Sequence, residues 1–117
     1  MTDALALTRD IDGDGRKDQF AINRMTWFYC LQWIWSAGGS DMDPEMTRYT
    51  FDTPEAKRGF QFHYDHMHKL KVCPQMSDLP NMSVEATFLT GKVSMVYNGA
   101  WWLSQARLAK GFEWDIA

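Results

Sequence analysis

The chain has 117 residues, of which 45% are hydrophobic and 15% aromatic, and this composition indicates at most one globular domain and excludes a disordered chain. The formal net charge is −3 and no basic patch stands out, which argues against nucleic-acid binding. No apolar run approaches the length of a membrane span, and residues 1–8 lack the basic start and the apolar run of a signal sequence.

An aspartate-rich loop at residues 10–18 follows the end of a helix at residues 3–7 and precedes a predicted strand at residues 19–22. Its sequence, DIDGDGRKD, places aspartates at positions 1, 3, 5 and 9 and a glycine at position 6 of an EF-hand-like calcium loop. Position 12 is Ala21 in place of the usual glutamate, so Gln19 or a water must complete the shell. The expected Ca²⁺ ligands are Asp10, Asp12, Asp14, the carbonyl of Arg16, Asp18 and Gln19. The alternative is a solvated turn whose carboxylates cap neighbouring amides.

The next segment, residues 24–37, predicts a helix that is apolar nearly all round. The residues that recur at helical spacing are Trp27, Phe28, Leu31, Ile34 and Trp35, and those that cover the other faces are Tyr29, Cys30 and Trp33. Such a helix requires burial on several sides, which a chain this short cannot supply alone. We therefore expect the chain to be an internal part of a longer protein and to self-associate.

Two further helices have clear start and stop signals. The glycine pair at residues 38–39 ends the first helix, because glycine adopts the left-handed cap conformation freely. The triplet Thr53–Glu55 combines an N-cap, a proline at the first helical position and an early acid, and predicts a helix to about Leu70. After a loop, Ser83 caps a short helix that reaches Thr90.

A strand, a tight turn and a helix start then follow in close succession. Lys92–Tyr97 reads as a strand, Asn98–Gly99 as the turn, and Trp101 and Trp102 fall in the first turn of the helix. Two indoles at such a corner are hard to bury completely. Their flat apolar faces and the free N–H groups of the helix start suit a ligand with both C–H faces and hydroxyls, such as a sugar.

The last helix is expected to end near Lys110, and residues 112–116 read as a final strand. The predicted fold class is therefore α/β, mostly helical with a few short strands. No nucleophile motif, phosphate loop or pair of catalytic carboxylates is present, so the chain is not expected to be an enzyme.

Four segments in this order resemble the extracellular solute-binding proteins of ABC importers, especially the sugar-binding family that includes maltose-binding protein. They are LTRDIDGDGRKDQFAI (7–22), WSAGGSDMDPE (35–45), FDTPEAKRGFQF (51–62) and FLTGKVSMVYNGAWW (88–102). The last is similar to a segment typical of the family, F..Gk.aM...G.W, at Phe88, Gly91, Lys92, Met95, Gly99 and Trp101.

The resemblance implies that residues 1–117 form a single partial domain, a segment of the C-terminal lobe of a periplasmic-binding-protein-like fold. It implies a periplasmic or extracellular location, with a lipid anchor possible in the full-length protein. The implied function is carbohydrate binding for uptake through an ABC permease, without direct membrane insertion. The alternative function is a calcium-stabilised interaction module with no small-molecule ligand.

The resemblance also implies ligand-binding residues. Trp101 falls on the sugar-stacking tryptophan of the family, although Ala100 replaces the proline that usually precedes it. A second family aromatic matches either Trp27 or Phe28. Four residues of the two turns complete the expected ligand set, of which Asn98 and Asp41 equally suit plain turns: Gly39, Asp41, Asn98 and Gly99. Some polysaccharide-binding members hold Ca²⁺ in a loop like that at residues 10–18.

Two weaker signals have plain structural explanations. Cys30 and Cys73 show no CxxC spacing and are expected to be two separate thiols. His63, His66 and His68 lack the i, i+4 pairing of metal-binding helices and are expected to lie on a helix face.

Overall fold

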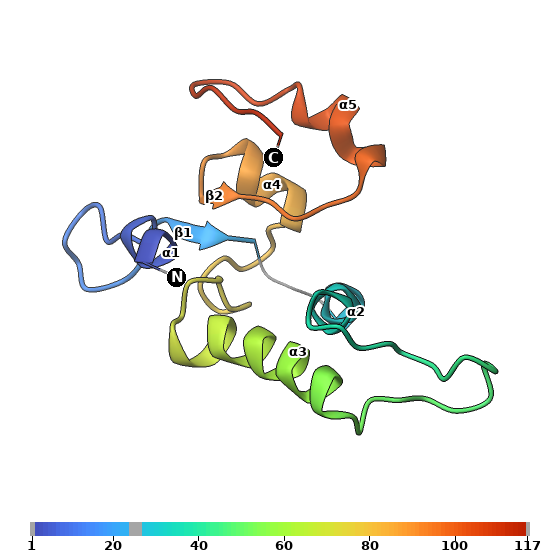
Figure 1. The fold of residues 1–117 in the computed structure, drawn as a ribbon. Coiled ribbons are helices and arrows are strands. Elements are labelled where there is room, and N and C mark those ends of the chain that lie inside the picture. The colour runs from blue at the N-terminus through green and yellow to red at the C-terminus, as the bar shows by residue number, and fades with distance from the viewer. Residues whose placement is uncertain (1, 24–26, 117) are drawn as a thin grey trace. The chain divides into compact units, whose positions relative to one another are not determined.

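The computed structural model describes residues 2–23 and 27–116, with the side chains of Thr2, Trp27 and Phe28 outside the described part (Figure 1). The chain divides into two compact units, Met1–Arg24 with Val72–Ala117, and Met25–Lys71. Among the described residues, no helix combines the length and the apolar character that a membrane crossing needs.

The first unit is built around two short parallel strands. β1 (Phe20–Ile22) pairs with β2 (Val93–Met95), so that Phe20 faces Val93 and Ile22 faces Met95 across the sheet. The helices of this unit are α1 (Thr2–Ala6), α4 (Val84–Leu89), the 3₁₀ helix η2 (Ala100–Trp102) and α5 (Leu103–Ala106). Its hydrophobic core consists of Phe20, Phe88, Val93, Trp102 and Ala106.

Local signals explain where α4 and β2 begin. The Ser83 hydroxyl accepts a hydrogen bond from the Ala86 N–H at 3.1 Å, as an N-cap does. Gly91 then takes a φ of 70°, a left-handed conformation that costs glycine little, and turns the chain into the strand.

The second unit consists of α2 (Trp27–Ser36), a long loop, α3 (Pro54–Tyr64) and a π-helical turn, η1 (Asp65–Lys69). Gly38 ends α2 with a φ of 83°, and Thr53 caps α3 by accepting a hydrogen bond from the Ala56 N–H. These features confirm the predicted start and stop signals. α3 and η1 together reach the predicted end near residue 70.

α2 and α3 lie side by side because Gly59 lets their backbones approach closely (Figure 1). A Cβ atom at position 59 would lie 2.6 Å from the backbone nitrogen of Ile34 and 2.7 Å from its Cα. Ile34 is fully buried at this crossing, and Trp33 packs on Phe62 with ring centroids 4.7 Å apart.

Two predictions near the C-terminus are wrong. The last helix ends at Ala106 rather than near Lys110. The N–H groups of Leu108 and Ala109 donate to carbonyls three residues earlier, and not four as in an α-helix. Residues 112–116 form no strand, since no described strand pairs with them. The rings of Phe112 and Trp114 pack instead against Phe88, with centroid distances of 5.4 and 6.3 Å.

The fold class is confirmed: the chain is mixed α/β and mostly helical, with two short parallel strands. The strand at residues 93–95 is shorter than the predicted Lys92–Tyr97. It stops early because the backbone of Tyr97 bonds to a side chain instead of continuing the ladder between strands.

Candidate functional site

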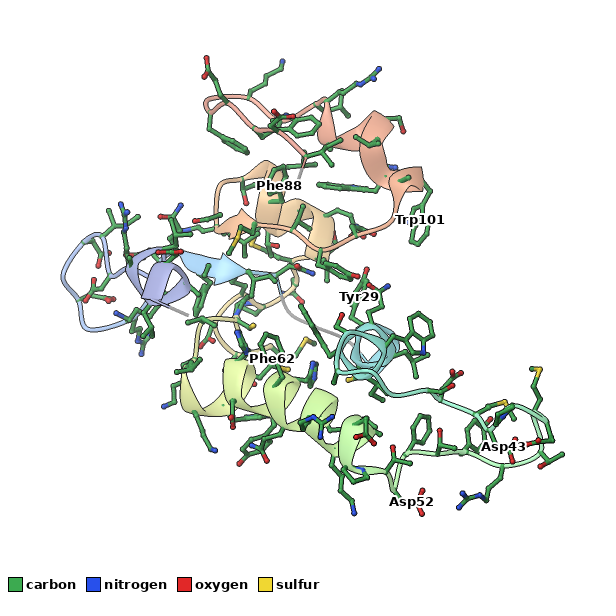
Figure 2. All side chains as sticks on the ribbon, viewed as in Figure 1. Tyr29, Asp43, Asp52, Phe62, Phe88 and Trp101 are labelled. Atoms are coloured by element: carbon green, nitrogen blue, oxygen red, sulfur yellow. The ribbon has the colours of Figure 1, made fainter. Side chains whose placement is uncertain are left out.

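Trp101 is the most exposed large aromatic of the first unit. Its side chain is 73% exposed, whereas that of Trp102 is 6% exposed. Trp102 packs edge-on against Phe88 at a centroid distance of 5.6 Å, as expected for a packing residue. In Figure 2 the exposed Trp101 ring lies at the start of η2. The corner therefore buries the indole of Trp102 and leaves the indole of Trp101 exposed to solvent.

Gly99 lets the Trp101 ring fold back over the turn. A Cβ atom at position 99 would clash with Cζ3 and Cη2 of the Trp101 indole. The backbone at Gly99 is extended, with φ −84° and ψ 160°, so the requirement for glycine here comes from the ring and not from the backbone.

Asn98 fixes the turn through both ends of its amide. Its Oδ1 accepts a hydrogen bond from the Gly99 N–H at 2.8 Å, and its Nδ2 donates to Oε1 of Glu85 at 3.4 Å. Glu85 comes from the first turn of α4, so the turn before Trp101 is tied to a neighbouring helix.

Asn23 is a buried residue that sequence reasoning missed. It follows β1 directly, has no exposed surface, and accepts a hydrogen bond from the Tyr97 N–H at 2.7 Å through Oδ1. Its Nδ2 donates to the Tyr97 carbonyl at 3.4 Å, and its backbone N–H donates to the Met95 carbonyl at 3.1 Å. The Asn23 side chain thus takes the place of the backbone hydrogen bonds between the strands, and it fixes the chain just before the Asn98 turn. In the sequence, an asparagine after the apolar run FAI looks like an ordinary loop residue, so its bonding to Tyr97 could not be predicted.

The Asp loop gathers three of its four aspartates. Carboxylate oxygens of Asp10, Asp12 and Asp18 lie within 4.8 Å of one another, and such a group of hard oxygen ligands can hold a metal ion. Asp14 is not part of this group, and its Oδ1 accepts a hydrogen bond from the Arg16 N–H at 2.8 Å.

Backbone amides hold the carboxylates of the Asp loop in place. Asp10 accepts from the N–H groups of Gly13 and Gly15 at 2.7 and 2.9 Å, and both glycines have positive φ. Asp18 accepts from the N–H of Ile11 at 2.7 Å and of Asp12 at 3.3 Å. The hydrogen bond from Ile11, followed by that from Asp12, lowers the pKa of the Asp18 carboxyl and keeps it charged.

Gln19 lies at the base of this loop, where Arg9 and Gln19 form an antiparallel bridge. Its Nε2 donates to the Gly91 carbonyl at 3.2 Å, which links the loop to the turn before β2. The roles of Asp14, Arg16 and Gln19 as metal ligands stay predictions.

The remaining ligand-binding predictions fall in the second unit. Asp41 accepts a hydrogen bond from the Trp35 indole at 3.3 Å, and Gly39 lies against Ile34 and Glu55. The side chains of Trp27 and Phe28 lie outside the described residues. The ligand-binding roles of Gly39, Asp41 and either Trp27 or Phe28 stay predictions.

The three histidines lie on α3 and on its continuation η1. His66 is buried, and its Nδ1 lies 2.9 Å from the Phe62 carbonyl. Among the described residues, the group of potential metal ligands that lie close together is the one formed by Asp10, Asp12 and Asp18. Cys30 and Cys73 are free thiols, and burial raises the pKa of Cys73 to about 12.

Comparisons with known proteins give a clear match in structure only. No protein-family model and no curated protein sequence matches the chain. The structure is similar to the ABC substrate-binding protein of Listeria monocytogenes solved in complex with cycloalternan, with a TM-score of 0.76 and 20% identity over 93% of this chain and 28% of that one. It is also similar to the maltose/maltodextrin-binding domain MalE of Bdellovibrio bacteriovorus bound to maltotriose, with a TM-score of 0.74 and 22% identity over 92% of this chain and 28% of that one.

Both similar proteins are described as binding proteins. The chain spans 28% of the length of each of them. The chain therefore has the fold of one part of a sugar-binding ABC substrate-binding protein, as its sequence resemblance predicted.

Proposed function

We propose that the chain is a segment of the C-terminal lobe of an extracytoplasmic carbohydrate-binding protein that serves an ABC importer. The observation that carries this proposal is the 73% exposed indole of Trp101 on a corner whose neighbouring residues are fixed by buried contacts. Proteins with this fold that were solved with cycloalternan and maltotriose support a carbohydrate as the ligand class.

The chemistry of the corner suits a sugar ring. The indole face of Trp101 stacks on the C–H face of the ring, where dispersion and exclusion of water stabilise the contact. Polar groups of the turn, Asn98 among them, orient the ring through its hydroxyls. The residues Gly39, Asp41 and either Trp27 or Phe28 belong to the same ligand set in this proposal.

In this proposal, binding shifts the equilibrium between an open and a closed arrangement of the two lobes. A sugar that contacts both lobes binds the closed form better and therefore increases its population. The closed form then delivers the sugar to the membrane permease.

Titration of the intact protein with maltotriose tests the proposal. We expect a saturable change in tryptophan fluorescence and a matching heat of binding in calorimetry, because Trp101 changes its environment on stacking. Absence of both signals with maltotriose and with other neutral oligosaccharides would contradict carbohydrate binding and favour an interaction module instead.

We further propose that the Asp loop binds Ca²⁺ in a structural role. The ion would offset the mutual repulsion of Asp10, Asp12 and Asp18, whose oxygens already lie within 4.8 Å of one another. Asp14, the Arg16 carbonyl and Gln19 complete the ligand set in this proposal. The close spacing of three carboxylates supports it.

Substitution of Asp12 by alanine tests the Ca²⁺ proposal. At a Ca²⁺ concentration ten times the Kd, wild type should gain about 1.4 kcal/mol of stability over the chelated protein, and Asp12→Ala should lose this gain. Thermal unfolding with Ca²⁺ and with chelator measures the stability that Ca²⁺ adds to wild type and to Asp12→Ala. The charge-matched control is Asp115→Ala, which removes one exposed carboxylate elsewhere. An equal loss of stability under chelator would mean that Asp12 acts without the ion.

A further inference from the structure

We infer that Glu85 is a specificity-determining residue of the Trp101 corner, admitting neutral sugars and rejecting those that carry carboxylate groups. This inference rests on the proposed carbohydrate function and goes beyond it, because it assigns the charge class of the ligand. It starts from a carboxylate that the fold places beside the site without a cation to neutralise it.

Glu85 is linked to the Trp101 indole through a chain of direct contacts. Its Oε1 accepts a hydrogen bond from the Asn98 amide at 3.4 Å, and Asn98 in turn accepts from the Gly99 N–H at 2.8 Å. Gly99 lies under the Trp101 ring, which occupies the space of the missing Cβ atom. The carboxylate, the amide and the indole therefore belong to one local cluster within the first unit.

The carboxylate of Glu85 is incompletely satisfied by the protein. It is half-buried, and within the described residues it forms no ion pair and receives no hydrogen bond other than that from Asn98. In contrast, Glu55 in the second unit pairs with Arg58 at 3.0 Å. The Oε2 atom of Glu85 thus remains available to accept a hydrogen bond from a ligand.

A free carboxylate oxygen in the same local cluster as an exposed indole selects ligands by charge. A sugar hydroxyl donates to it in a charge-assisted hydrogen bond, which is stronger than a bond between neutral groups. A uronate carboxylate cannot donate and is repelled by the like charge. Stacking on Trp101 does not distinguish these sugars, so the discrimination must come from a charged neighbour.

Substitution of Glu85 by glutamine tests this role with little change of shape. In calorimetric titrations of the intact protein, Glu85→Gln should bind maltotriose about tenfold more weakly than wild type, because a charge-assisted hydrogen bond becomes a neutral one. It should bind trigalacturonate about fivefold more tightly than wild type, because the repulsion is removed. Glu113→Gln removes one exposed negative charge from a residue outside this chain of contacts, and it should change neither affinity.

The outcomes separate this inference from the proposed function. If wild type binds maltotriose and Glu85→Gln has the same affinities for both sugars, Glu85 has no role in selectivity while carbohydrate binding stands. If Glu85→Gln lowers the affinity for both sugars by the same factor, Glu85 only supports the turn and the inference is overturned. If wild type binds neither sugar, the proposed function and this inference fail together, and thermal unfolding of each variant distinguishes lost binding from lost folding.

Discussion

Replacement of Trp101 by alanine is expected to weaken maltotriose binding by the intact protein at least about tenfold, because the stacking surface of the sugar site is removed. The side chain is 73% exposed, so its loss should change the free energy of unfolding by only about 0.5 kcal/mol. Calorimetric titration measures the affinity, and denaturant unfolding measures the stability. An unchanged affinity would remove Trp101 from the site.

Two further variants make this result specific. Tyr49→Ala removes a ring that is 64% exposed in the second unit, and it should leave the affinity unchanged. Gly99→Ala keeps the indole but places a methyl group where the Trp101 ring now lies, so the ring must swing away from the turn. Because the backbone at Gly99 tolerates alanine, this variant should lose affinity without losing stability.

Replacement of Gly59 by alanine is expected to destabilise the second unit by about 1–2 kcal/mol. The added methyl group would meet backbone atoms of Ile34 at 2.6 and 2.7 Å, and backbone cannot rotate out of the way as a side-chain end can. Overpacking costs about 1–3 kcal/mol, and a clash with backbone lies in the upper part of that range, at about 2–3 kcal/mol. The roughly 1 kcal/mol helix preference of alanine over glycine is subtracted from this cost. Denaturant unfolding of the variant and of wild type measures the difference.

The matched control for Gly59→Ala is Lys57→Ala, at an exposed position of the same helix. Lysine and alanine have similar helix preferences, so this change should alter stability by less than about 0.5 kcal/mol. A Gly59→Ala protein as stable as wild type, or more stable, would mean that α2 and α3 do not cross this closely in solution.

Much of the fold was predictable because its signals are local. Thr53 and Ser83 cap their helices through their own hydroxyls, and Gly38 and Gly91 adopt the positive φ that their sequence contexts suggest. Each of these signals depends on a few neighbouring residues, so the sequence contains all the information needed to read it.

The errors have non-local causes. Residues 112–116 have a strand-like pattern, but a strand also needs a partner, and the aromatic rings there find Phe88 instead. Asn23 looks like a loop residue until its partner Tyr97, far away in sequence, is known.

Of the candidate site, the sequence pattern predicts the place of Trp101 at a corner where it is hard to bury, and its side chain is exposed. Its role as a ligand platform stays a prediction. The polar surroundings of Trp101 do not follow from the sequence, because Glu85 contacts Asn98 only after α4 and the turn are both in place. Contacts between elements are fixed by packing, which a single sequence does not display.

The pairing of β1 with β2 has a consequence for the order of folding. The stretch Met25–Lys71 interrupts the first unit, so Phe20 and Val93 meet only after a long loop has been closed. Closing such a loop costs chain entropy before any contact repays it, whereas the two helices of the inserted unit are connected locally. The inserted helical pair is therefore expected to gain its structure first, and the pairing of β1 with β2 is expected to form late, once both ends of the insertion have been brought together.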